Sequence, residues 1–189
     1  MIKSCTCFVL LQLIVCISAN AGEISHAAVD YSDGIYTVEF DASVNAQSTQ
    51  IYNLLTDYNQ LYRLNDSIVE SADISAQGAL IKKSRLLLHT CITFFCRDSV
   101  LIEDVQGNDK DEVIATVDPV DSDFVSGQSI WKILQSDKDH TSITLRRNIE
   151  PGFWFPPVIG PWLIKKKMIQ ELSVMIERLE QFANARSSS

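Results

Sequence analysis

The chain has 189 residues, which is enough for one ordinary domain and leaves little room for a second. Apolar residues make up 46% of the sequence and charged residues 21%, a balance that supports a buried core and differs from that of a disordered chain. The 16 basic and 24 acidic residues give a net charge of −8, which would repel a phosphate backbone. We therefore expect one globular domain and exclude nucleic acid as a partner.

Residues 1–21 have the pattern of a secretory signal peptide. Lys3 supplies a positive charge, residues 5–17 are almost wholly apolar, and residues 19–21 match the small-x-small motif that signal peptidase accepts. An uncleaved membrane anchor is the alternative, but the apolar run is shorter than the roughly 20 residues that span a bilayer. We expect cleavage near Ala21 and a periplasmic or secreted protein. Loss of Lys3 would change the net charge from −8 to −9.

The first elements of the remaining chain follow from side-chain periodicity. Residues 22–33 show no strong pattern, and we expect them to be mobile. Apolar and polar side chains alternate over 34–44, which predicts a strand with one solvent-exposed face. Between 46 and 57 apolar residues recur at i, i+3 and i+4, which predicts a short helix, and Leu61 and Leu64 indicate a second one.

Strand-like runs separated by polar turns occupy the middle of the chain. They cover 68–74, 79–93, 99–105, 112–117, 127–135 and 142–149. The breaks contain Gly, Pro, Asn and Asp, and such short turns join neighbouring strands of an antiparallel sheet. Beyond a proline-containing loop at 151–161, apolar residues at spacings of four and three predict one amphipathic helix over 162–185.

This order of elements predicts the fold class. The long helix carries five or more large apolar side chains, whose burial is worth on the order of 10 kcal/mol before entropy, so it must pack on the sheet. We therefore predict an α+β fold in one domain, 34–185, followed by a tail at 186–189. In it, a seven-stranded curved antiparallel sheet wraps around the C-terminal helix, and two short helices follow the first strand.

Over residues 34–182 the sequence resembles the START-like helix-grip superfamily, specifically its polyketide cyclase/dehydrase and lipid-transport group and the related coenzyme-Q-binding proteins. The resemblance rests on the element order, on IYNLLTDY at 51–58, on DSDFVSG at 121–127 and on PGFWFPPVIGP at 151–161. The last two segments resemble those of exported bacterial members. The resemblance implies a hydrophobic cavity under the long helix. It does not imply one function, because carriers, cyclases and regulatory modules share the fold.

The walls of such a cavity would be apolar, aromatic or adaptable side chains, which suit a lipid, isoprenoid or polyketide-like ligand. The candidates are Tyr36, Val38, Phe40, Phe124, Trp131, Ile133, Met168, Leu172 and Met175. The same side chains could instead fill a solid core, because periodicity does not distinguish a core from a cavity wall. We therefore predict binding or carriage of a hydrophobic small molecule in the periplasm, and a solid core remains the alternative.

Two adjacent arginines, Arg146 and Arg147, lie on the last expected strand, so one of them must face inward or reach an edge. A buried arginine is costly unless it is paired, so the inward one is a candidate for gripping a ligand carboxylate or carbonyl. We assign this role to Arg146. An ion pair with Glu103, Asp104 or Glu150 is the alternative.

The sequence contains no motif typical of catalysis or of a metal site, and it predicts no cofactor. HExxH, paired CxxC, GxSxG and glycine-rich phosphate loops are absent, and the three histidines do not cluster in the sequence. We interpret His89 as a structural or surface residue, and the aspartates at 118, 121 and 123 as part of a polar turn. A cavity enzyme of this fold needs only one or two polar groups. A cyclase or dehydratase therefore remains the alternative to a noncatalytic carrier.

Cys91 and Cys96 can form a disulfide only if the chain reverses between them. On one continuous strand they would lie about 16 Å apart, whereas the Cα atoms of a disulfide lie about 4.4 to 6.8 Å apart. A four-residue hairpin loop at 92–95 would place the two cysteines opposite each other. Both outcomes, a disulfide and two free thiols, remain open.

Three consecutive aromatic residues and three consecutive lysines suggest a membrane-facing lip at the cavity entrance. These residues are Phe153, Trp154 and Phe155, and Lys165, Lys166 and Lys167. Three neighbouring rings cannot all point into one core, so at least one could enter a headgroup layer while the lysines approach anionic lipid. A hydrophobic plug over the end of the sheet is the alternative. The sequence does not specify the oligomeric state.

Overall fold

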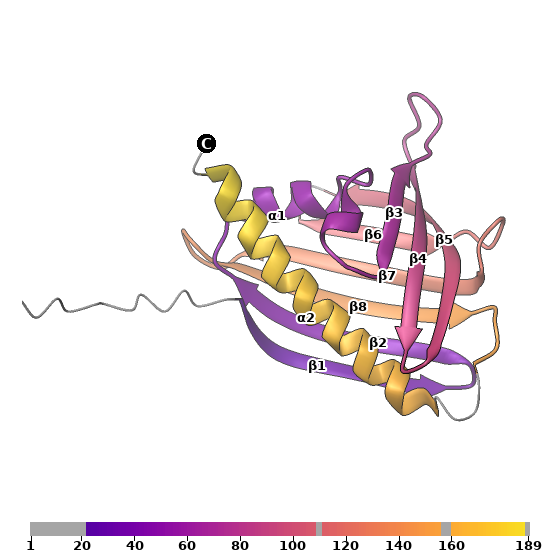
Figure 1. Cartoon of the computed structure of the whole chain (residues 1–189). Helices are drawn as coiled ribbons and strands as arrows, with labels where there is room; N and C mark the ends of the chain where they lie inside the picture. The colour runs from indigo at the N-terminus through magenta and orange to yellow at the C-terminus, as the bar shows by residue number, and fades with distance from the viewer. Residues whose placement is uncertain (1–21, 109–110, 156–159, 188–189) are drawn as a thin grey trace, which may run out of the picture.

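Figure 1 shows the computed structural model of the chain, which describes residues 22–108, 111–155 and 160–187. The strands are β1 (Glu23–Ser32), β2 (Ile35–Val44), β3 (Ile68–Asp73), β4 (Lys82–Ile92), β5 (Phe95–Asn108), β6 (Glu112–Val117), β7 (Phe124–Gln135) and β8 (Thr141–Pro151). The helices are α1 (Ser48–Leu55), the 3-10 turn η1 (Leu61–Arg63) and α2 (Gly160–Ser187). The expected signal peptide lies outside the described residues, and the expected tail begins inside α2.

One curved antiparallel sheet holds the long helix α2 against its concave face (Figure 1). In the described part of the chain the sheet has eight strands in the order β1-β2-β8-β7-β6-β5-β4-β3. Strands β3 to β8 form the predicted meander, and the β2–β8 pair joins its end to the beginning of the chain. The predicted α+β class and arrangement are therefore confirmed, but the predicted count of seven strands is wrong.

The additional strand is β1, in the segment that we expected to be mobile. Most of its side chains are exposed, and Val29 is its one buried apolar residue, so the sequence lacks a strong alternation. Antiparallel backbone pairing with β2 keeps β1 in the sheet. The two strands are joined by Asp33 and Gly34, which have φ values of 53° and 89°. An Asp-Gly pair with both residues at positive φ is typical of a two-residue hairpin turn.

The packing of α2 changes along its length. Toward its C-terminal end Ile176, Leu179 and Ala183 are fully buried. Toward its N-terminal end the cavity-facing side chains of Met168 and Leu172 are only half-buried. The helix is therefore packed tightly against the sheet at one end and incompletely at the other.

Polar contacts fasten the tightly packed end of α2 to loops on either side. The carboxylate of Glu180 accepts a hydrogen bond from the backbone N–H of Asn45 at 2.9 Å. Arg178 pairs with Asp66 at 2.5 Å. None of the helices in the described ranges is long and apolar enough to cross a membrane.

Candidate ligand-binding site

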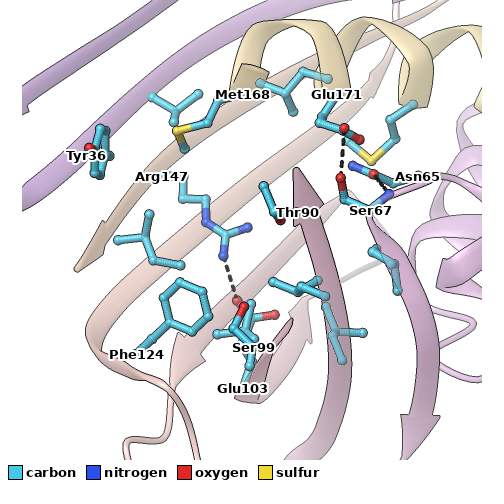
Figure 2. Close-up of a pocket in the computed structure, with 18 of the residues that line it drawn as sticks. Tyr36, Asn65, Ser67, Thr90, Ser99, Glu103, Phe124, Arg147, Met168 and Glu171 are labelled. Atoms are coloured by element: carbon cyan, nitrogen blue, oxygen red, sulfur yellow. Dashed lines mark hydrogen bonds and ion pairs between the residues drawn. The ribbon is translucent and has the colours of Figure 1, made fainter. Parts of the chain in front are cut away.

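A cavity of about 310 Å³ lies between the concave face of the sheet and α2. Figure 2 shows its walls, to which β2, β4, β5, β7, β8 and α2 contribute side chains. Seven of the predicted residues line it: Tyr36, Val38, Phe124, Trp131, Met168, Leu172 and Met175. The structure thus contains a cavity where a solid core was the alternative.

Phe40 and Ile133, which we also expected to contact a ligand, lie in the packed core instead. Phe40 is fully buried and Ile133 almost so, and neither lines the cavity. Both belong to strand positions nearer the Val44 end of β2, where Ile176 of α2 fills the space above the sheet. Strand alternation places these residues on the correct face. It does not reveal where along that face the helix stops packing.

The inward-facing arginine is Arg147, so the assignment of this role to Arg146 is wrong. Arg146 lies on the outer face, where its two terminal nitrogens bond the carboxylate of Asp41 at 3.0 and 3.1 Å. The side chain of Arg147 lies in the cavity wall, and its Nη2 is 3.5 Å from Oε1 of Glu103. The alternative of an ion pair with Glu103 is therefore confirmed for Arg147.

The Glu103–Arg147 pair crosses the floor of the cavity from β5 to β8 (Figure 2). Two strands lie between them, so a flat sheet would separate the two backbones by about 14 Å. The curvature of the sheet brings them closer, and the intervening strands contribute the small side chains of Ser129 and Ala115 at this level. The pair is therefore able to lie across the sheet surface.

Glu103 is only 7% exposed. Burial raises the pKa of its carboxyl group above the ordinary value, although the neighbouring Arg147 acts in the opposite direction. Among the described residues, the Arg147 side chain has no other hydrogen-bond acceptor, so most of its five N–H donors remain available to a ligand.

A second polar group lies where α2 meets the loop after η1. Ser67 Oγ donates a hydrogen bond to Oε1 of Glu171 at 2.8 Å, and Lys167 forms an ion pair with the same carboxylate. Two tyrosines add to the polar lining: burial raises the pKa of Tyr36 to about 12, and burial also raises the pKa of Tyr58. Both phenols are therefore neutral hydrogen-bond donors at physiological pH.

Sequence reasoning missed Glu171 and Tyr58, and it named Glu103 only as one of three possible ion-pair partners of the inward arginine. For Glu103 a stronger signal existed, because it stands at an inward position of β5 between the apolar residues Leu101 and Val105, both of which are buried. A charge between two apolar residues at such a position is an indication of a functional group or a buried ion pair. It meets Arg147 only in the folded chain, 44 residues further on.

The aromatic residues at 153–155 were expected to form either a membrane-facing lip or a hydrophobic plug, and the structure contains features of both. Phe153 and Phe155 line the cavity, with ring centroids 5.1 Å apart, as the plug alternative requires. The guanidinium of Arg97 lies 4.2 Å from the Phe153 ring centroid. Trp154 is 70% exposed, as the lip requires. The prolines that follow it lie outside the described residues.

Two of the three lysines are engaged in ion pairs. Lys165 lies 3.5 Å from the carboxylate of Asp30, and Lys167 pairs with Glu171. In the described ranges Lys166 has no ion pair, and its side chain is exposed. The basic cluster is thus weaker than its sequence suggested.

A groove of about 360 Å³ adjoins the cavity at the N-terminal end of α2. Groove and cavity share five lining residues: Tyr36, Pro151, Phe153, Phe155 and Ile164. Trp154 also lines the groove, and the nearby Trp162 is 68% exposed. This end of the molecule is therefore the candidate entrance.

Cys91 and Cys96 form a disulfide near the tip of the β4–β5 hairpin. The turn is tighter than expected, since Thr93 and Phe94 alone connect the two strands.

His89 lies near the same tip, hydrogen-bonded to Asp98. Asp118 accepts the backbone N–H of Val120, in agreement with a polar turn.

Neither a family model nor a curated protein matches this chain. Three solved structures are similar to it. A START superfamily protein from Mycobacterium smegmatis has 18% identity and a TM-score of 0.62, and the match covers 79% of this chain and 97% of that one. An aromatase/cyclase from Streptomyces has 12% identity and a TM-score of 0.59, covering 81% and 96%. A STAR-related lipid transfer protein from Xanthomonas axonopodis has 14% identity and a TM-score of 0.57, covering 84% and 98%.

Proposed function

We propose that this chain, which has the START-like helix-grip fold that its sequence resembles, binds or carries a hydrophobic small molecule in the cavity beneath α2. The ligand class is a lipid, an isoprenoid or a polyketide-like molecule. The site of action is the periplasm, a proposal that rests on the leader pattern of residues 1–21. No cofactor is part of the proposal.

The observation that carries the proposal is an apolar cavity with an ion pair on its floor. Apolar and aromatic side chains form most of the wall, and the charged groups that face inward from the sheet include the ion pair of Arg147 and Glu103. Such a site suits a molecule with an apolar body and one hydroxyl, carbonyl or carboxylate group. Arg147 would donate to that group, and Tyr36 or Tyr58 could donate beside it.

The names of the structural neighbours agree with this ligand class. One is named a STAR-related lipid transfer protein and another an aromatase/cyclase. At these identities the likeness extends to the fold alone, so the ligand of this chain follows from its own cavity.

We expect native mass spectrometry of the protein purified from its own host to show one apolar molecule per chain. Thr90 lines the cavity from β4, and Thr116 lies on the exposed face of β6 (Figure 2 shows Thr90). Thr90→Trp should reduce ligand occupancy at least about tenfold, because the indole would occupy the cavity. Thr116→Trp is the matched control and should retain the ligand. A ligand-free wild type, or equal occupancy in both variants, would contradict the proposal.

A cavity enzyme, such as a cyclase or dehydratase, is the second candidate function. Two ionisable groups, Glu103 and Arg147, converge inside the cavity, and the charge of Glu103 is a minor cause of the raised pKa of the nearby Tyr58, after its burial. A carboxyl group with a raised pKa beside a guanidinium is able to exchange a proton with a bound carbonyl compound. The recovered ligand distinguishes the two functions, because a carrier releases it unchanged whereas an enzyme converts it. Glu103→Gln would stop such a conversion.

We further propose that the entrance docks transiently on an anionic membrane, with Trp154 and Trp162 entering the headgroup layer. Because two lysines are paired within the protein, the aromatic rings supply most of the attraction. In vesicle co-sedimentation, Trp154→Ala with Trp162→Ala should weaken binding by more than about tenfold. Lys166→Gln should weaken it about fivefold at low salt, from about 1 kcal/mol for one lysine.

Tyr62→Ala is the control for membrane docking, because Tyr62 is an exposed aromatic on η1 that does not line the groove at the entrance. It should bind vesicles as the wild type does. If the wild type and the double tryptophan variant sediment equally, the docking proposal is wrong.

A further inference from the structure

Four side chains with metal-binding chemistry form a square on one face of the β4–β5 hairpin. The strand register places His89 opposite Asp98 and Cys91 opposite Cys96. Residues two apart on a strand share a face, so all four side chains point to the same side. Their neighbours Thr90, Ile92, Phe95 and Arg97 point to the other side and line the cavity. The square therefore faces away from the cavity.

The ligand atoms of this square are already close together. The Sγ atoms of both cysteines and a ring nitrogen of His89 all lie within 4.8 Å of one another. Nε2 of His89 is 3.4 Å from Sγ of Cys91. Thiolate sulfur and imidazole nitrogen are the ligands that Zn²⁺ prefers in proteins.

Asp98 orients the histidine for this purpose. Its Oδ1 lies 2.5 Å from Nδ1 of His89, which leaves Nε2 directed toward the sulfur atoms. A carboxylate bonded to the second ring nitrogen is the usual partner of a metal-ligating histidine, because it fixes the tautomer and the ring orientation. The square thus contains three ligands and an orienting group.

In the structure the two sulfur atoms are bonded to each other, so they are not available as thiolates. We propose that reduction of the Cys91–Cys96 disulfide opens a three-ligand site for Zn²⁺ or a chemically similar divalent cation, formed by Cys91, Cys96 and His89. The hairpin tip would then be a metal site controlled by the redox state of the protein. This inference is independent of the proposed cavity function.

The chemistry balances with a dithiol as reductant. Two thiols of the reductant become a disulfide, and Cys91 and Cys96 become two thiols. Binding of the cation then releases both thiol protons, so that two thiolates and neutral His89 coordinate it and water completes a tetrahedral shell. In such a shell the sulfur atoms lie roughly 3.7 Å apart at Zn–S distances of about 2.3 Å. Cys96 is exposed, so a reductant can reach the bond.

Cobalt is the probe for this site, because tetrahedral thiolate coordination of Co²⁺ produces a charge-transfer band and visible ligand-field bands. The full-length chain would be used without a tag, with Cys5, Cys7 and Cys16 replaced by serine so that no other thiol is present. After anaerobic reduction, we expect one equivalent of Co²⁺ to bind per chain and Zn²⁺ to displace it. The oxidised chain should show neither band.

Three variants test the assigned roles in the reduced chain. Cys96→Ser should abolish the charge-transfer band, and His89→Ala should weaken Zn²⁺ binding at least about tenfold. Asp98→Asn should weaken it about 10- to 100-fold, as for other partners of metal-ligating histidines. His140→Ala is the matched control, because His140 also pairs with an aspartate, Asp137, at 2.8 Å. It should bind the metal as tightly as the parent chain.

Two results would overturn the proposal. One is the absence of a thiolate-to-cobalt band in the reduced parent chain whose circular dichroism spectrum is that of the folded protein. The other is equal Zn²⁺ affinity in His89→Ala and in the His140→Ala control. The cavity proposal is tested by ligand occupancy in the oxidised protein, so neither result bears on it.

Discussion

Replacing Arg147 with leucine is expected to lower the free energy of unfolding by about 3–5 kcal/mol at neutral pH, because Glu103 would remain buried without a counter-charge. The matched control is the adjacent Arg146→Leu. Its ion pair with Asp41 lies on the outer, solvent-exposed face, where such pairs contribute about 0–1 kcal/mol. Urea denaturation at pH 7 measures both. Equal losses for the two arginines would contradict the buried pair.

The loss for Arg147→Leu should depend on pH. Burial raises the pKa of Glu103, so its contribution to stability is fully present below its ordinary value of 4.5 and is lost as the pH rises toward the raised value. Removal of the Arg147 charge raises the pKa of Glu103 further, so more folding stability is lost at neutral pH. The variant should therefore approach wild-type stability as the pH falls to about 4.5. The double variant Glu103→Leu with Arg147→Leu should recover most stability at pH 7.

Two leucines on α2 allow the packed and open ends of the helix to be compared. Leu179 is fully buried, whereas Leu172 is half-buried and lines the cavity. Leu179→Ala should cost about 2–5 kcal/mol, because it leaves a void in a close-packed region. Leu172→Ala should cost about 1 kcal/mol, because its side chain already borders empty space and loses fewer contacts.

For ligand binding the order should be reversed, and Leu172→Ala should have the larger effect. Leu172→Ala should weaken retention of the bound molecule in native mass spectrometry, and Leu179→Ala should leave it unchanged at temperatures where the variant is folded. Thermal unfolding monitored by circular dichroism gives the stability. If Leu172→Ala destabilises the protein as much as Leu179→Ala does, the space beneath the N-terminal half of α2 is filled.

Local sequence patterns predicted those elements whose side chains alternate strongly between polar and apolar. Residues 112–117, expected as a strand, are β6 with the same bounds. β1 was missed because its pairing depends on backbone hydrogen bonds, and only the Asp33-Gly34 turn signalled it. For Arg147 strand alternation does predict the face. Leu145 and Ile149 lie two residues before and after it, so all three side chains are on the same face, and the two apolar ones are buried.

Whether space remains beneath a helix depends on distances that periodicity does not contain. Phe40 and Trp131 are on the same concave face, yet Trp131 lines the cavity and Phe40 is enclosed in the core. Likewise, the Glu103–Arg147 pair forms because curvature brings β5 and β8 together. Such long-range geometry is a property of the assembled sheet, and no local window of sequence reports it.

The connection between the two ends of the chain has a consequence for folding. β2 pairs with β8, which is distant from it in the sequence, as between Tyr36 and Ile149, and α2 packs against β1 and β2. Contacts of such long range are slow to form, since a large loop must close before they stabilise anything. Until α2 is synthesised and docked, the apolar concave face remains in contact with water, where it is prone to aggregation and is a natural target for chaperones. The cavity therefore cannot close before the C-terminal helix is present.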